Sequence, residues 1–177
     1  MSIFAELADA LAPSSSAEDK QKARARAQQI AKPGDWFSMI IDHHLKLEDA
    51  FAVVKATNDE AGRRDAQKKL GIILTGHANA EESVIYPAMV ESGEDRHALH
   101  GYTEQAQVKI DMASLGALPA MSQSYNDKLE AIREAVAHHM FEEEGTWYPD
   151  LAKSASTTEQ AELTKKYSEE YNRYVGT

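Results

Sequence analysis

The sequence predicts an all-α protein, an up-down-up-down four-helix bundle with extra N-terminal helical segments and a C-terminal helix. Apolar residues recur at intervals of three and four along most of the 177-residue chain, and no segment shows the alternation typical of a half-buried strand. Clusters of proline, glycine and serine separate four long segments of this kind by short connections. Because short connections make consecutive helices antiparallel neighbours, we expect the four to form one bundle.

Residues 1–35 are expected to form a helical extension before the bundle. Apolar residues at helical spacing predict a short amphipathic helix near the start: Ile3, Phe4, Leu7 and Leu11. Pro13 would end this helix. A second, polar helix is expected over residues 17–31 with Ser16 as its N-cap, and Asp35 would cap the first helix of the bundle.

The bundle itself is predicted over residues 36–151. Its helices are expected at about 36–57, 61–86, 95–115 and, from Ser122 or Ser124, to about 148. Pro87 and Pro149 are expected to stop the second and fourth helices, because proline lacks the N–H that an α-helix needs.

The last segment, residues 152–177, is expected to form one more helix packed on the bundle. Thr157 or Thr158 would cap it. Its apolar stripe is Leu163, Tyr167, Tyr171 and Tyr174.

The composition excludes several classes of function. Lys and Arg total 19 against 29 Asp and Glu, a formal net charge of −10, and such an acidic surface repels nucleic-acid phosphates and anionic lipid. The absence of cysteine excludes disulfides, thiolate zinc sites and iron–sulfur clusters. No basic flank marks a secretory signal, and no apolar run reaches the ~18 residues of a membrane span. We therefore expect a cytoplasmic protein without nucleic-acid or membrane partners, and the sequence identifies no protein partner.

An internal repeat relates the second predicted helix to the fourth. Adding 62 to a residue number in one helix gives an identical residue in the other at several places: His77 and His139, Glu81 and Glu143, Tyr86 and Tyr148, Pro87 and Pro149. The period is too long for a solenoid repeat. Two copies of a helix pair, related by a pseudo-twofold axis, explain the repeat better.

A histidine and a glutamate interrupt the apolar face of each of these two helices. They are His77 and Glu81 in one, and His139 and Glu143 in the other. Burying a carboxylate without a partner costs several kcal/mol, and a metal ion would compensate both helices at once. Residues four apart lie on one helix face, about 6 Å apart along the axis, so both pairs can reach one cluster. Imidazole with carboxylate favours iron, manganese or zinc, and a carboxylate can bridge two ions ~3.5–4 Å apart.

Other polar residues near these positions are harder to place from spacing. His43 and His44 in the first helix could each point inward. His138 lies one step off the inward face, and we expect it at the surface or supporting a ligand. The run of glutamates at 142–144 is expected to be solvated apart from Glu143. Nearby aromatic residues are expected to pack the core without taking part in chemistry: Tyr86, Tyr102, Trp147 and Tyr148.

These motifs resemble those of the hemerythrin-like family, also called the HHE cation-binding domain. The matching segments are Ile41-Asp42-His43, His77-Ala-Asn-Ala-Glu81-Glu82 with Tyr86-Pro87, and His139-Met-Phe-Glu-Glu143-Glu144 with Tyr148-Pro149, and the resemblance spans about residues 36–151. It implies ligand roles for His43, His77, Glu81, His139 and Glu143. It favours His43 over His44, because the family's histidine directly follows an acidic residue.

The sequence departs from the family pattern in the third helix, where a histidine is replaced by Gln105. Three alternatives remain open. The site holds one ligand fewer, Glu104 completes it as a ligand or bridge, or His100 one turn earlier does. Gln105 is expected near the cluster, where it would orient Glu104 or a metal-bound water, since a neutral amide oxygen is a weak ligand beside imidazole.

The resemblance implies a cofactor of two iron ions in an Fe–O–Fe or Fe–OH–Fe type centre, with manganese or zinc as alternatives. It implies a protein that binds or senses dioxygen, nitric oxide or iron and redox state. The alternative is a di-iron enzyme that acts on peroxide or dioxygen at the open coordination position left by Gln105. Binding or sensing is favoured because the sequence shows no obvious substrate pocket. A metal-free structural bundle is the third interpretation.

Overall fold

The computed structural model describes residues 15–176, and over this range it is helical without any strand. The elements are α2 (Ala17–Ile30), α3 (Trp36–Ala56), α4 (Glu60–Ala80), η1 (Glu81–Ile85), α5 (Tyr86–Glu91), α6 (Asp95–Ala117), α7 (Gln123–Glu142), η2 (Glu143–Trp147), α8 (Tyr148–Ser154) and α9 (Thr157–Val175). The predicted all-α class is confirmed, whereas the up-down-up-down order stays a prediction. The short helix expected around Ile3 and Leu11 lies outside the described residues.

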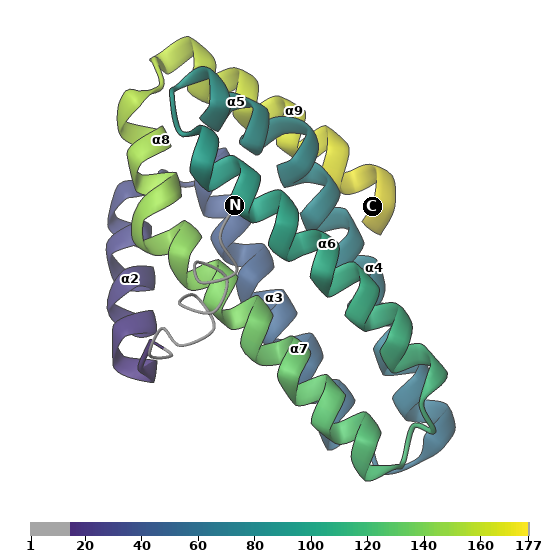
Figure 1. Ribbon diagram of the computed structural model, residues 1–177. Helices are drawn as coiled ribbons and strands as arrows, with labels where there is room; N and C mark the ends of the chain where they lie inside the picture. Colours follow the sequence, from purple (N-terminus) through teal and green to yellow (C-terminus); the bar gives the residue numbers. More distant parts are fainter. Residues whose placement is uncertain (1–14, 177) are drawn as a thin grey trace, which may run out of the picture.

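Four long helices, α3, α4, α6 and α7, run along the length of the molecule (Figure 1). Two further helices pack near the end of the bundle at which α4 and α7 finish. Helix α2 packs on α3, α7, η2 and α8, and helix α9 packs on α3, α4 and η1. Both therefore cover the region that carries the repeated histidines and glutamates. No helix within residues 15–176 is long and apolar enough to cross a membrane.

Side-chain caps fix where several helices begin. Ser16 and Asp35 accept backbone N–H groups at the starts of α2 and α3, which confirms both predictions. Ser122, one of the two candidates, accepts the Tyr125 N–H and begins α7. Helix α9 is capped by Ser156 through a capping box, so the expectation of Thr157 or Thr158 is wrong by one residue or two.

Two π-helical turns, η1 and η2, interrupt the second and fourth long helices at equivalent places. The N–H of Tyr86 donates to the carbonyl of Glu81, and that of Tyr148 to the carbonyl of Glu143, five residues back in each case. Each turn ends two residues before a proline, which would clash with the carbonyl four residues back in a regular α-helix. The wider turn accommodates the proline, and the chain continues as α5 and α8. The prediction that proline stops these helices is therefore wrong.

The apolar core consists of two clusters. One cluster, around Trp36, Tyr148 and Tyr167, lies at the end covered by α2 and α9. The other, around Leu70 and Leu129, fills the remainder of the bundle. In both long helices that carry them, the repeated histidines and glutamates lie where the residues of one cluster give way to those of the other. Apolar packing on both sides thus shields these polar side chains from water.

Candidate metal centre

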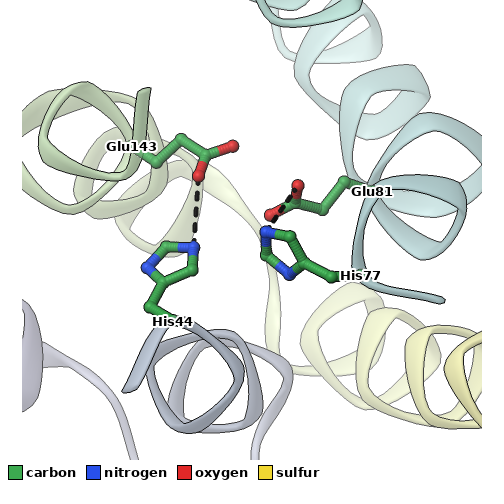
Figure 2. Close-up of side chains that lie close together, drawn as sticks. All are labelled: His44, His77, Glu81 and Glu143. Atoms are coloured by element: carbon green, nitrogen blue, oxygen red, sulfur yellow. Dashed lines mark ion pairs between the residues drawn. The ribbon is translucent and has the colours of Figure 1, made fainter. Parts of the chain in front are cut away.

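A buried group of two histidines and two glutamates lies where α3, α4, η1 and η2 meet. It consists of His44, His77, Glu81 and Glu143, whose ligand atoms all lie within 4.8 Å of one another. Figure 2 shows two facing pairs. In one pair, His44 Nε2 lies 3.3 Å from Glu143 Oε2, and in the other, His77 Nε2 lies 3.2 Å from Glu81 Oε2. Both carboxylates are completely buried, so this group gathers several potential ligand atoms in the interior.

Three more side chains reach the same group. His139 places its Nε2 3.0 Å from Glu143 Oε1. The hydroxyl of Tyr148 bridges the two carboxylates, 2.7 Å from Glu81 Oε1 and 2.5 Å from Glu143 Oε1. Gln105 donates from Nε2 to Glu81 Oε2 at 2.7 Å. The three imidazoles and two carboxylates together, His44, His77, Glu81, His139 and Glu143, are called the central cluster below.

The three histidines of the central cluster share one arrangement. In each, Nε2 faces the cluster while Nδ1 contacts a partner outside it. The outer partners are Glu144 for His44 at 2.7 Å, Glu104 for His139 at 2.7 Å and the Tyr167 hydroxyl for His77 at 3.3 Å. Metal-binding histidines are typically held in this way, because an outer hydrogen bond fixes the ring orientation and leaves the inner nitrogen to the metal.

Helix α2 contributes Arg24 to the outer partners. Its Nε lies 3.0 and 3.1 Å from the two carboxylate oxygens of Glu144, and its Nη1 lies 2.9 Å from Glu48 Oε1. Glu144 is therefore buried between Arg24 and His44, with 1% of its surface exposed. The prediction that Glu144 is solvated is wrong, because its partner lies 120 residues away in the chain and leaves no local signal.

Each glutamate of the central cluster is the first residue of a π-turn. Single π-turns inside α-helices occur frequently at functional sites. Here the histidine four residues earlier still belongs to the regular helix, whereas the glutamate begins the wider turn. A Tyr-Pro pair follows each turn and is the local sequence feature that the two turns share.

The family model for the hemerythrin HHE cation binding domain matches residues 37–151. The chain belongs to this family. A curated relative, the DNA nickase of Nostoc sp. (strain PCC 7120 / SAG 25.82 / UTEX 2576), is 24% identical over 128 residues, which cover 72% of this chain and 35% of the relative. The chain thus spans about a third of that protein's length. No solved structure matches the chain significantly.

In this hemerythrin HHE domain, α3 contributes His44 to the central cluster. The family resemblance had favoured His43. His43 is buried but faces elsewhere. Its Nδ1 lies 2.9 Å from the Tyr167 hydroxyl, and its ring stacks on Tyr171 with 3.6 Å between centroids. The reason is that α9 packs on α3 and gives that helix a second buried face. Gly76 permits the close approach of α9 to α4, because a Cβ at this position would lie 2.6 Å from Val175.

The structure leaves the other candidate ligands outside the central cluster. Glu104 contacts His139 from outside and also belongs to a separate, half-buried group with His100 and Glu142. His100 Nε2 lies 3.3 Å from Glu104 Oε1 and 3.4 Å from Glu142 Oε2. His138 is half-buried, with Nε2 3.8 Å from Glu142 Oε2. None of the three replaces the histidine that the third bundle helix lacks.

Gln105 occupies the edge of the central cluster. Besides Glu81, its Nε2 contacts the Tyr86 hydroxyl at 2.8 Å and lies 3.5 Å from His139 Nε2. The expectation that Gln105 lies near the cluster agrees with these distances, although the carboxylate that it orients is Glu81 and not Glu104. Tyr86 in turn fits against Gly101, where any Cβ would lie 2.7 Å from the tyrosine ring. The tyrosines at the cluster thus hydrogen-bond its ligands, beyond the packing role expected from sequence.

Burial and neighbouring charges shift the pKa values of the histidines and glutamates in the central cluster, some upward and some downward. Burial and the charge of Glu143 raise the pKa of Glu81 to about 8. Burial alone would raise the pKa of Glu143 as well, but His139 and His44 hold it well below its usual range. Burial would lower the pKa of His44, yet its contacts with the carboxylates of Glu143 and Glu144 raise it to about 9, and similar contacts raise that of His139. Burial depresses the pKa of His77. Without a metal, protons supply the positive charge that the carboxylates need.

The residues present fit a metal cation. Among the described residues, His44 Nε2 and Glu143 Oε2 are buried and have no hydrogen-bond partner, although they lie only 3.3 Å apart. A buried polar atom without a partner costs about 1–3 kcal/mol, and one cation between these two atoms would satisfy both. The donor set of imidazole nitrogens and carboxylate oxygens is the one that iron, manganese and zinc take.

Proposed function

We propose that this hemerythrin HHE domain holds a di-iron centre and uses it to bind or sense a small molecule. The proposed ligands are the five side chains of the central cluster, with Glu81 and Glu143 able to bridge two ions. The observation that carries the proposal is the common orientation of three imidazoles, each with Nε2 inward and Nδ1 held outside. A bundle without a metal has no need to bury this arrangement together with two carboxylates.

The chain's own residues define the chemistry of the site. A bound iron pair would supply an exchangeable coordination position and a redox change, which suit dioxygen, nitric oxide or peroxide as ligand. Tyr148 and Tyr86 place hydroxyls beside the carboxylates. They donate to these carboxylates and so orient them beside that position, while the apolar clusters on either side exclude bulk water. The proposed small-molecule partner is therefore dioxygen, nitric oxide or peroxide.

A second candidate function is an enzyme that activates peroxide or dioxygen. Gln105 favours it, because an amide stands where the family pattern has a histidine, and its Nε2 is occupied by Glu81 and Tyr86. One metal position would then lack a protein ligand and stay available to a reactant.

We do not extend the nickase activity in the Nostoc relative's name to this chain. The relative is much longer than the matched segment. The formal net charge of −10 also opposes binding to a phosphate backbone. We propose instead that the chain acts on a small molecule in the cytoplasm.

The test of the proposed function is metal content and absorption after reconstitution with ferrous iron, before and after exposure to dioxygen. We expect about two iron ions per chain and a near-ultraviolet band that appears with dioxygen. The adjacent histidines of α3 provide a matched control. His44→Phe should lose most of the iron, whereas His43→Phe, which keeps a ring against Tyr171, should retain it.

Two outcomes would contradict the proposal. Wild-type protein that binds less than one iron, manganese or zinc ion per chain would make the domain a structural bundle. Iron loss in His43→Phe without loss in His44→Phe would mean that the central cluster is not the ligand set.

A further inference from the structure

A cavity of about 190 Å³ lies between α4, α6 and α7, on the side of the bundle away from α9. Its walls are mostly apolar, with Leu74, Val108, Met112, Val136 and Met140 among them. Three side chains of the metal region, His77, Gln105 and His139, also line it. Gly71, Thr75 and Lys109 complete the wall toward the surface between α4 and α6. The cavity thus leads from the surface of the domain to the central cluster.

The volume of the cavity defines the size of its ligand. An apolar cavity of ~150 Å³ binds benzene, so about 190 Å³ accommodates a benzene ring with one or two added heavy atoms. Dioxygen, nitric oxide and peroxide, with two heavy atoms each, would leave most of this space unfilled. The cavity is therefore larger than the small molecules proposed above require.

The chemistry of the walls defines the ligand's polarity. A charged ligand would lose its hydration against the apolar walls, and the charged side chains Lys109 and Glu104 of the wall are already paired, with Glu82 and His139. One polar atom remains available. Gln105 uses its Nε2 for Glu81 and Tyr86, and its buried Oε1 has no partner among the described residues. An acceptor in this position calls for a ligand that carries one hydrogen-bond donor.

We propose that this cavity binds a small neutral organic molecule, a phenol or an alcohol of about seven heavy atoms, with its hydroxyl donating to Gln105 Oε1. That this molecule would lie beside metal ions rests on the proposed function, whereas its binding in the cavity does not. The ligand would lie next to Gln105, at the edge where the family pattern has a histidine. Gln105 thereby leaves space and an acceptor for an organic molecule in place of an imidazole.

Methionine methyl groups provide a direct readout. Met112 and Met140 line the cavity, whereas Met89 is buried in the other core cluster and Met121 is exposed. Full-length protein labelled with 13C at the methionine methyls and freed of metal should be titrated with phenol and, separately, with toluene. We expect saturable shifts at Met112 and Met140 for both probes, with little change at Met89 and Met121. No saturable shift at Met112 and Met140, or equal shifts at all four, would overturn the proposal.

Variants that fill the cavity provide a second test of the proposal. Val108→Phe should weaken binding of both probes at least tenfold, and Leu74→Phe, at a half-buried wall position, serves if Val108→Phe does not fold. Ile110→Phe, on the exposed face of the helix that carries Val108, is the matched control and should leave the affinity for both probes unchanged. Unchanged affinity in a folded Val108→Phe or Leu74→Phe protein would refute the cavity as the binding site.

The role of the Gln105 acceptor is tested by Gln105→Met. Phenol and toluene have equal numbers of heavy atoms, so loss of the acceptor should weaken phenol relative to toluene by about five- to tenfold. An unchanged ratio would contradict the hydrogen bond. Because these measurements use metal-free protein, they are independent of the iron measurements. Probe binding without iron binding would leave the cavity proposal intact while refuting the proposed function. Iron binding without probe binding would refute the cavity proposal and leave the proposed function intact.

Discussion

Replacing Arg24 by alanine tests the connection between α2 and the metal centre. Arg24 pairs with Glu144, whose side chain is 2% exposed, and with Glu48, whose side chain is 46% exposed. Breaking a buried ion pair costs about 3–5 kcal/mol. Arg24 is itself 19% exposed and Glu144 keeps its contact with His44, so we expect a smaller loss of unfolding free energy, about 2 kcal/mol. For a chain of this size that corresponds to a fall in Tm of about 4–8 °C.

The assay is thermal unfolding of Arg24→Ala beside Glu48→Ala, each in metal-loaded and chelator-treated form. Glu48→Ala removes the exposed partner only, and exposed ion pairs contribute about 0–1 kcal/mol. Because Glu144 orients His44, Arg24→Ala should also release metal to a chelator more readily, whereas Glu48→Ala should not. Equal changes in Tm for the two variants would refute the reasoning, since they would show that burial of Glu144 does not distinguish the pairs.

Three further predictions concern other residues of the metal centre. His77→Ala should lose most of its metal while His138→Ala keeps it, as measured by elemental analysis; equal loss would place His138 in the site. Gln105→His should hold metal more tightly against a chelator, because imidazole is the better ligand; weaker retention would contradict its position beside Glu81. In metal-free protein, His44 alone should account for a loss of about 3 kcal/mol of stability between pH 6.5 and 9, because the folded protein raises its pKa to about 9 and keeps a proton that the unfolded chain releases; the raised pKa values of Glu81 and His139 act in the same direction. Thermal unfolding across this range measures the loss, and stability that rises with pH would refute it.

The sequence was sufficient wherever the relevant signal is local. The spacing of four between histidine and glutamate places both side chains on one helix face, and the apolar residues around them identify that face as internal. All four residues identified in this way, His77, Glu81, His139 and Glu143, lie in the central cluster. The caps at Ser16 and Asp35 are local in the same sense, since each side chain bonds an N–H three residues later.

Features that depend on distant segments could not be predicted. Glu144 looked solvated because the residue that buries it, Arg24, lies in a separate helix. The π-turns were interpreted as helix ends, because a proline gives the same local signal whether the chain stops or widens by one residue. Only the continuation of the helix into α5 and α8 distinguishes the two.

The exchange of His43 for His44 shows how one covering helix alters a register taken from the family resemblance. The repeat of 62 residues pairs His43 with Gln105, and Gln105 does reach the central cluster. His43 does not, because α9 lies against α3 and provides a second apolar surface, where Tyr171 stacks on the imidazole. The neighbouring His44 then takes the inward position and gains Glu144 as its outer partner. The repeat therefore holds between α4 and α7, which share a π-turn and its ligands, and fails by one residue between α3 and α6. A symmetry read from sequence predicts positions only where both copies pack against equivalent neighbours.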